Sequence, residues 1–147
     1  MSFQNQFTKT TTDANLMETV HHGSAEYPFR YYYENIALFD FKCIDWHWHS
    51  ELEFIYIESG NVVFDIGTVH FELNEGNGIM INSKILHRLQ SSSDAIIPNF
   101  LFQPSFIAPQ DSLIYKKYIK THHNLTKIIL LDSSVLRNKI FYSIDNK

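Results

Sequence analysis

Short runs of alternating apolar and polar residues fill the middle of the chain, and small turn signals separate them. The turn signals are glycine-bearing steps at Gly60, Gly67 and Gly76. Many short strands at regular spacing with small turns predict an all-β sandwich or barrel. The segments expected to be strands are 30–33, 39–44, 51–57, 62–66, 69–73, 78–81, 88–90 and 97–102.

One of these segments, 52–57, is apolar on both faces. One face can line the interior of a barrel, because strand side chains alternate between the two sides of a sheet. The other face then needs cover from a second sheet, a helix or a partner subunit.

The two ends of the chain have different patterns. Residues 1–25 are rich in Thr, Asn and Ser and lack periodicity, which predicts a flexible tail or arm. Residues 111–121 predict a short helix, and a second helix is expected from Ser133 or Ser134, with apolar positions running to Ile144. That second helix would end at the chain terminus without a capping signal, so we expect a longer natural chain. The predicted divisions are an arm over 1–25, a barrel over 26–108 and a helical part over 109–147, the start of a dimerisation helix or linker.

Composition narrows the class of protein. The chain has 147 residues, enough for one domain, and carries a net charge of −4 with scattered basic residues, which argues against direct DNA binding by this chain. Cys43 is its only cysteine, so no internal disulfide can form. We found no apolar run long enough for a membrane span and no signal peptide, and the expected location is the cytoplasm.

Candidate chemistry concentrates at His47, His49 and Glu53. Their spacing places all three side chains on one face of an extended strand. His87 follows a later glycine-bearing turn as a fourth candidate ligand. Three imidazoles and one carboxylate suit Fe, Mn, Ni, Zn or Cu. The alternative is a polar cluster that binds no metal and hydrogen-bonds internally or to an effector.

Three neighbouring features have competing interpretations. Glu51 shares the parity of His49 and Glu53 and could help to hold a cation, a polyol or an amine, although a solvated start of the strand is slightly favoured. Trp46 and Trp48 project to the opposite face, where packing is expected. The adjacent pairs 21–22 and 122–123, all histidine, are expected on the surface.

The spacing resembles the cupin family. His47, one residue, His49, three residues, Glu53, six residues and Gly60 match the first cupin motif in full. The second motif keeps Gly76 and His87 but has Asn82 in place of its Pro and Lys84 in place of its inner Gly.

Within that fold, residues 28–108 resemble the N-terminal sensor domain of AraC-type transcription regulators. The segments that carry this likeness are Pro28-Phe29-Arg30, 46–56, 75–83 with Leu86-His87, and 102–107. The resemblance implies a mainly β fold, a cupin-type double-stranded β-helix barrel (jelly roll), with short C-terminal helices.

The resemblance also implies a function. In this family the cupin domain binds a small effector and forms homodimers, and a separate C-terminal helix-turn-helix domain, absent from this chain, binds DNA. The implied metal positions are His47, His49, Glu53 and His87, for a divalent transition metal. The implied effector is small and polar, and Glu51 joins the same four residues as its expected contacts. In sugar-sensing relatives the N-terminal arm can fold over the bound effector. No catalytic activity and no membrane association are expected.

Two alternatives remain open. A stand-alone metal-dependent cupin enzyme, a dioxygenase or an isomerase, would use the same four ligands with Glu51 as acid or base. A dimerisation module that has lost effector binding would keep the fold alone.

Overall fold

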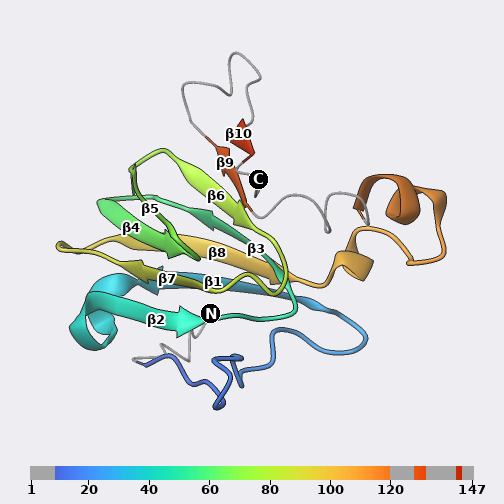
Figure 1. Cartoon of the computed structure of the whole chain (residues 1–147), viewed down its shortest axis with the longest axis horizontal. Helices are drawn as coiled ribbons and strands as arrows, with labels where there is room; N and C mark the ends of the chain where they lie inside the picture. Colours follow the sequence, from blue (N-terminus) through green and yellow to red (C-terminus); the bar gives the residue numbers. More distant parts are fainter. Residues whose placement is uncertain (1–8, 120–127, 132–141, 144–147) are drawn as a thin grey trace.

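Two antiparallel sheets face each other and enclose the core (Figure 1). The structure is a computed structural model that describes residues 9–119, 128–131 and 142–143. The larger sheet has the strand order β1 (Phe29–Asn35), β8 (Ile96–Phe102), β3 (Leu52–Tyr56), β6 (Gly78–Ile81), β9 (Ile128–Leu131) and β10 (Tyr142–Ser143). The smaller sheet has the order β2 (Cys43–His47), β7 (His87–Gln90), β4 (Asn61–Ile66) and β5 (Val69–Asn74).

Successive strands switch between the two sheets, which makes the barrel a double-stranded β-helix. From β1 to β8, only the β4–β5 hairpin keeps two consecutive strands in one sheet. The predicted mainly β, cupin-type fold is therefore confirmed.

The core lies between the sheets and uses every second residue of the strands. Ile55, Phe64, Ile79, Leu89 and Ile97 are fully or almost fully buried. Full burial of one such side chain contributes about 1.5–3 kcal/mol, so this interior can hold the two sheets together.

The outer face of the larger sheet is aromatic. The ring of Phe100 lies at its centre, 5.1 Å from the Tyr31 ring and 6.2 Å from the Phe54 ring between centroids. Tyr56, on the outer face of β3, is 40% exposed. The rings beside this face of β3 belong to the same sheet, so they are not the second sheet, helix or partner subunit expected to cover it.

The prediction of a strand over 39–44 is wrong for residues 39–42. Residues Ile36–Leu38 and Asp40–Lys42 form two 3-10 turns, and β2 begins only at Cys43. The Asn35 side chain accepts a hydrogen bond from the backbone of Ala37 at 2.9 Å, and this local bond favours the turn over a strand.

The C-terminal part, predicted to be helical over 109–147, differs from its prediction in two places, the first being the strand β9. Ser112 Oγ accepts a hydrogen bond from the Tyr115 backbone, and the chain is helical from residue 113, with the π-helix Tyr115–Ile119, as expected. The second predicted helix is wrong at Tyr142 and Ser143, which form β10 against β9. The rest of that helix, and the histidines at 122 and 123, lie outside the described residues.

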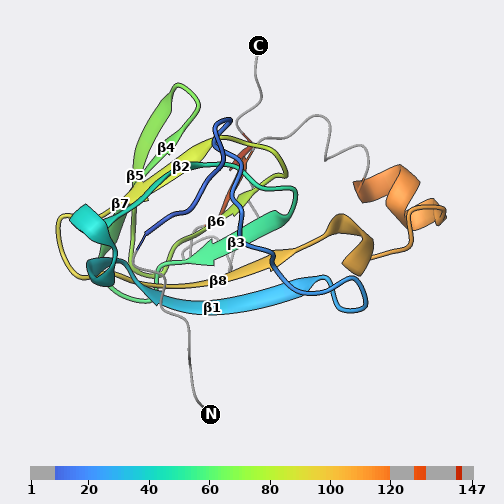
Figure 2. The ribbon, with the colours of Figure 1, turned by 90° about the horizontal axis from the view of Figure 1, so that it is seen from below.

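The predicted arm lies against the end of β2 (Figure 2). The Glu18 backbone donates to the Trp48 carbonyl at 2.9 Å, and the Trp48 backbone donates to the Leu16 carbonyl at 3.0 Å. Asp13 closes the turn before this contact by accepting from the Met17 backbone. From Lys9 onward, the arm is therefore attached to the barrel by backbone hydrogen bonds, while the predicted divisions at residues 25 and 108 stay predictions.

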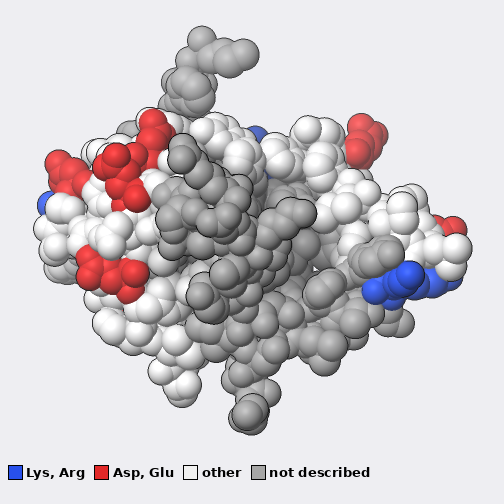
Figure 3. Space-filling view, turned by 90° about the horizontal axis from the view of Figure 1, so that it is seen from above, with Lys and Arg blue, Asp and Glu red and all other residues white. Residues whose placement is uncertain are grey.

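Charge is unevenly spread over the described surface. In the view of Figure 3, basic side chains gather at one end, where Tyr115–Ile119 carries Lys116 and Lys117, and most acidic ones lie at the other end. None of the described helices has the length and hydropathy that a membrane span requires.

Candidate ligand and metal site

Four side chains from three strands and one loop meet inside the barrel. His47 ends β2, His49 follows it in the loop, Glu53 lies in β3 and His87 begins β7. All four are buried, and one ligand atom from each lies within 4.8 Å of the others. The structure thus brings together all four metal candidates expected from the sequence. We call these four residues the histidine cluster.

Each imidazole of the histidine cluster is oriented by a backbone carbonyl two residues away. The Nδ1–O distances are 2.7 Å for His47 to Asp45, 3.1 Å for His49 to Glu51 and 2.7 Å for His87 to Ile85. A carbonyl only accepts, so each Nδ1 carries the proton. Nε2 is then the atom that each ring could offer to a metal ion, which is the arrangement that metal-binding histidines use.

Glu53 links two of these imidazoles. Its Oε2 lies 3.2 Å from His49 Nε2 and 3.1 Å from His87 Nε2. Burial by itself would raise the pKa of Glu53, but the hydrogen bonds and charges of the two imidazoles outweigh it and hold that pKa well below its usual range. Burial likewise opposes protonation of His49, and the contact with Glu53 reverses this, so the pKa of His49 is raised.

His47 differs from the other two imidazoles. Burial, reinforced by the neighbouring His87, lowers the pKa of His47 to about 3. The ring is therefore neutral at physiological pH and keeps the Nε2 lone pair of a metal ligand.

The donor set fits a divalent transition metal. Since Nδ1 of His49 and His87 already donates to a carbonyl, their Nε2 atoms need either extra protons or a cation to face the Glu53 carboxylate. A metal ion can replace those protons, and three imidazoles with one carboxylate suit Zn, Fe, Mn, Ni or Cu. The histidine cluster could therefore hold such an ion.

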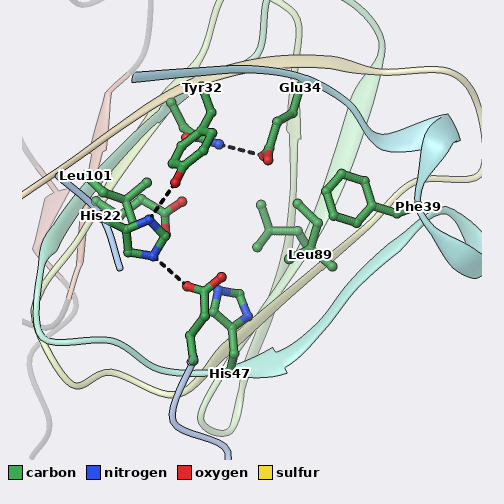
Figure 4. A pocket seen from close by; sticks show the side chains of 11 residues that line it. His22, Tyr32, Glu34, Phe39, His47, Leu89 and Leu101 are labelled. Atoms are coloured by element: carbon green, nitrogen blue, oxygen red, sulfur yellow. Dashed lines mark hydrogen bonds and ion pairs between the residues drawn. The ribbon is translucent and has the colours of Figure 1, made fainter. Parts of the chain in front are cut away.

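A cavity of about 40 Å³ adjoins the histidine cluster (Figure 4). His47 and Glu53 form part of its wall, and Phe39, Leu89 and Leu101 supply apolar surface. The arm and β1 complete the wall, so the cavity is bounded by both sheets and by the N-terminal segment.

The arm contributes His22 and Glu18 to this cavity. His22 Nε2 lies 2.8 Å from Glu18 Oε2, and His22 Nδ1 lies 2.9 Å from the Tyr32 hydroxyl on β1 (Figure 4). Burial raises the pKa of Tyr32 to about 12, so the hydroxyl keeps its proton. The prediction of a surface position is wrong for His22, which is 8% exposed, whereas His21 is exposed.

Glu34 and Asn99 form a second polar group in the cavity. Asn99 Nδ2 donates to Glu34 Oε2 at 2.9 Å, and we call these two residues the Glu34–Asn99 pair. Burial raises the pKa of Glu34 to about 7, the negative charges of Glu53 and Glu18 add to the effect, and the bond from Asn99 opposes it. Asn99 Oδ1 is buried and has no hydrogen-bond partner among the described residues.

Comparison with known proteins identifies the class of domain. Residues 39–109, just under half of the chain, match the family model described as AraC-like ligand binding domain. This segment is similar to AraC-like ligand-binding domains.

The relatives agree with this assignment. The chain is 31% identical over 112 residues to the uncharacterized HTH-type transcriptional regulator YdeC of Bacillus subtilis, a match that covers 75% of this chain and 38% of that protein. The chain thus spans less than two fifths of the length of this curated relative.

The chain is also similar to two solved structures. ToxT from Vibrio cholerae O395, in complex with a naphthyl butenoic acid, has a TM-score of 0.49 at 18% identity, covering 71% of this chain and 42% of ToxT. A cupin 2 conserved barrel domain protein from Salinispora arenicola has a TM-score of 0.48 at 13% identity, covering 60% of this chain and 71% of its own. Neither likeness bears on what this domain binds.

Glu51 lies outside the histidine cluster. Its Oε1 accepts from Gln103 Nε2 at 2.8 Å, and its Oε2 is 3.8 Å from His49 Nδ1. The side chain lines a different cavity, of about 300 Å³, with Asp13 and Thr19 of the arm. Glu51 is only 9% exposed, so the expectation of a solvated strand start is wrong.

The two tryptophans pack outside the cavity that adjoins the histidine cluster. The Arg88 guanidinium lies 5.2 Å from the ring centroid of Trp46, and Trp48 Nε1 donates to the Asn15 carbonyl of the arm at 2.9 Å. Neither residue is among those that line that cavity, which agrees with the expected packing role.

Sequence reasoning missed His22, Glu34 and Asn99. Asn99 had a usable signal, because it alternates with Ile97 and Leu101, both buried, and so marks a polar position on an inward face. His22 has no such periodicity, and only the packing of the arm brings it to the cavity.

Proposed function

We propose that this chain is the effector-sensing and dimerisation part of an AraC-type transcription regulator whose DNA-binding domain lies outside the chain. The match to an AraC-like ligand-binding domain and the likeness to an HTH-type regulator support this proposal. The effector is a small polar molecule, the working form is a cytoplasmic homodimer, and DNA is bound through the separate domain.

The observation that carries the proposal is a cavity shared by the arm and the barrel. A molecule in this cavity contacts Glu18 and His22 of the arm as well as residues of both sheets. Its binding free energy then depends on where the arm lies, and a ligand shifts an equilibrium only by such a difference in affinity. Occupancy would thereby change how the two subunits present their DNA-binding domains to half-sites.

The proposed metal site is the histidine cluster. His47, His49, Glu53 and His87 would hold a divalent transition metal, which when bound would supply a Lewis-acid contact for an oxygen or nitrogen atom of the effector. The three backbone carbonyls keep the imidazoles turned toward this point.

The same cluster also favours a second candidate, a metal-dependent cupin enzyme. Such an enzyme needs an acid or base beside the metal. Glu51, which the sequence suggested, is engaged by Gln103, whereas Glu34 lies in the cavity with a pKa raised to about 7. A sensor and an enzyme therefore differ in whether the bound molecule is converted.

The test uses the native gene product from its source cells. We expect an intact mass well above the 17.3 kDa of this chain, retention of the protein on DNA from its own upstream region, and a change in that retention when the effector is added. A mass equal to that of the chain, without DNA retention, would contradict the sensor proposal. Turnover of small molecules by the metal-loaded protein would then be measured for the enzyme.

Ligand screening distinguishes a sensor from a module that only dimerises. A sensor gains thermal stability from its effector, because a ligand that binds only the folded state stabilises it by mass action. The absence of any shift over a panel of sugars, amines and carboxylates, with dimers still present, would favour the dimerisation module.

A further inference from the structure

The proposal here rests on the proposed sensor function and names the chemistry of its ligand. We propose that the effector carries a primary ammonium group, which binds in the barrel cavity to Glu34 and Asn99 Oδ1.

The first argument is an unsatisfied acceptor. Asn99 is 3% exposed and lines the cavity, and its Oδ1 has no partner among the described residues. Its Nδ2 is already used, because it donates to Glu34. Leaving a buried acceptor unpaired is costly, so a group that donates a hydrogen bond at this place would gain the bond that the protein itself does not supply.

The second argument is charge. Three carboxylates line the cavity, from Glu18, Glu34 and Glu53, and none of the described lining residues is Lys or Arg. Glu53 is matched by two imidazoles and Glu18 by His22, whereas the partner of Glu34 is a neutral amide. Glu34 is thus the carboxylate in this cavity that lacks a cationic neighbour at hydrogen-bond distance.

The raised pKa of Glu34 agrees with this geometry. Burial, and with it the negative charges of Glu53 and Glu18, disfavours the ionised form of Glu34 until a positive charge arrives. An ammonium group carries that charge and three donors, enough for both the Glu34 carboxylate and Asn99 Oδ1. An anionic ligand would meet repulsion from all three carboxylates.

The size of the cavity limits the ligand. About 40 Å³ is room for a few water-sized groups, since one water needs roughly 10–15 Å³ of such volume. An ammonium head on a short alkyl stem fits, and Phe39, Leu89 and Leu101 offer the stem an apolar wall. We therefore expect a small aliphatic amine in place of a bulky or multiply charged ligand.

The test compares three probes of similar size on the full native gene product: n-propylamine as its ammonium ion, 1-propanol and propionate. Binding is followed at pH 8 by ligand-observed NMR and by thermal shift. We expect saturable binding of propylammonium, and at least tenfold weaker binding of the alcohol and the carboxylate. Equal or tighter binding of propanol or propionate, or no binding of propylammonium up to about 50 mM, would overturn the proposal.

Variants locate the site. Glu34→Gln keeps the shape of the side chain and removes its charge, and Asn99→Leu removes the free acceptor. Each should weaken propylammonium binding at least tenfold. The control Glu75→Gln neutralises an exposed carboxylate in the β5–β6 turn and should leave binding unchanged. Unchanged binding in Glu34→Gln would place the amine elsewhere and overturn the proposal. If a variant fails to fold, the comparison of the three probes on the unaltered protein still decides.

Failure of this proposal is distinguishable from failure of the sensor function. Should propanol or propionate bind and alter DNA retention, the ammonium assignment falls and the sensor stands. If propylammonium binds as expected but DNA is never retained, the ligand chemistry stands and the regulator proposal falls.

Discussion

The two polar groups of the barrel cavity differ in how fully their atoms are paired. In the histidine cluster, every Nδ1 meets a carbonyl and the Glu53 carboxylate meets two imidazoles. In the Glu34–Asn99 pair, one amide oxygen has no partner and the carboxylate meets only an amide.

This difference shows which side chains the protein orients before a ligand binds. Orienting bonds hold the imidazoles in place before anything binds, which lowers the entropic cost of taking up an ion. The Glu34–Asn99 pair instead leaves hydrogen-bonding capacity open. A buried polar group with open capacity points to a ligand that is absent from the protein itself.

The largest expected effect tests the fixed group. The double variant His47→Ala, His49→Ala should lose the response to Zn²⁺, Ni²⁺ or Mn²⁺, with affinity falling at least about 100-fold, since changes even to the partners of metal ligands cost 10–100-fold. The measurement is the metal-dependent shift in Tm, together with the metal content after dialysis. We expect the metal-free variant to stay folded.

The matched control is His70→Ala. This histidine is exposed and pairs with Asp65 outside the cavity, so its removal should not change metal affinity. Unfolding of the double variant without metal would instead show that the histidine cluster is a structural polar network.

A pH dependence tests the open group. The pKa of Glu34 is raised from 4.5 to about 7, so the folded state binds this proton more tightly than the unfolded state does. The destabilisation from Glu34 is absent below about pH 4.5, grows as the pH rises and is complete above about pH 7. Relative to Glu34→Gln, the unaltered protein should lose about 3 kcal/mol of unfolding free energy between pH 4.5 and pH 8.

Denaturant unfolding over this pH range measures that difference. Glu75→Gln serves as the control, because its carboxylate is exposed and its pH profile should parallel that of the unaltered protein. Parallel profiles for Glu34→Gln as well would show that Glu34 ionises without penalty, and the contrast between the two groups would disappear.

A smaller effect is expected where the arm meets the barrel. Tyr32→Phe removes the hydroxyl that contacts His22 Nδ1 and should cost about 1 kcal/mol, the usual net contribution of a hydrogen bond. Proteolysis of the arm should become faster. Tyr31→Phe, on the outer face of the same strand, should change neither quantity, and equal effects from both variants would argue against the His22 contact.

The smallest effect concerns an unpaired group that faces no ligand. Ser83 Oγ is buried without a partner among the described residues and is not part of the cavity wall, so Ser83→Ala should be neutral or stabilising by up to about 1 kcal/mol. Ser91→Ala removes a hydroxyl that donates to the Asn61 carbonyl and should destabilise by about 1 kcal/mol. A higher Tm for Ser91→Ala than for Ser83→Ala would contradict the expected link between hydrogen-bond pairing and stability.

The sequence predicted the strands well where alternation is strict. Val62, Phe64 and Ile66 alternate with outward residues, and β4 spans Asn61–Ile66 as expected. The pattern failed at 39–42, where Asp40–Lys42 form a 3-10 turn with Phe41 and Lys42 at positive φ, and at β9 and β10, where pairing of β9 with the distant β6 and of β10 with β9 decides the structure. Local patterns do not encode such pairing.

The sequence predicted the histidine cluster but not the other polar residues of the cavity. His47, His49 and Glu53 lie close in sequence and in the structure, but the prediction that they share one face of a single strand is wrong, because they come from β2, the following loop and β3. Glu34 and His22 reach the cavity through strand pairing and arm packing, which no local spacing reveals. The unpaired oxygen of Asn99 depends on atomic geometry and has no signature in sequence.

The bond from the indole of Trp48 to the arm has a spectroscopic consequence. Its Nε1 donates to the Asn15 carbonyl, so the emission of this ring reports whether the arm is in place. The chain has two tryptophans, and Trp46→Phe would leave Trp48, at the junction with the arm, as the single tryptophan. Release of the arm would expose that indole to water and shift its emission to longer wavelength. Ligand titrations could then be followed by intrinsic tryptophan fluorescence.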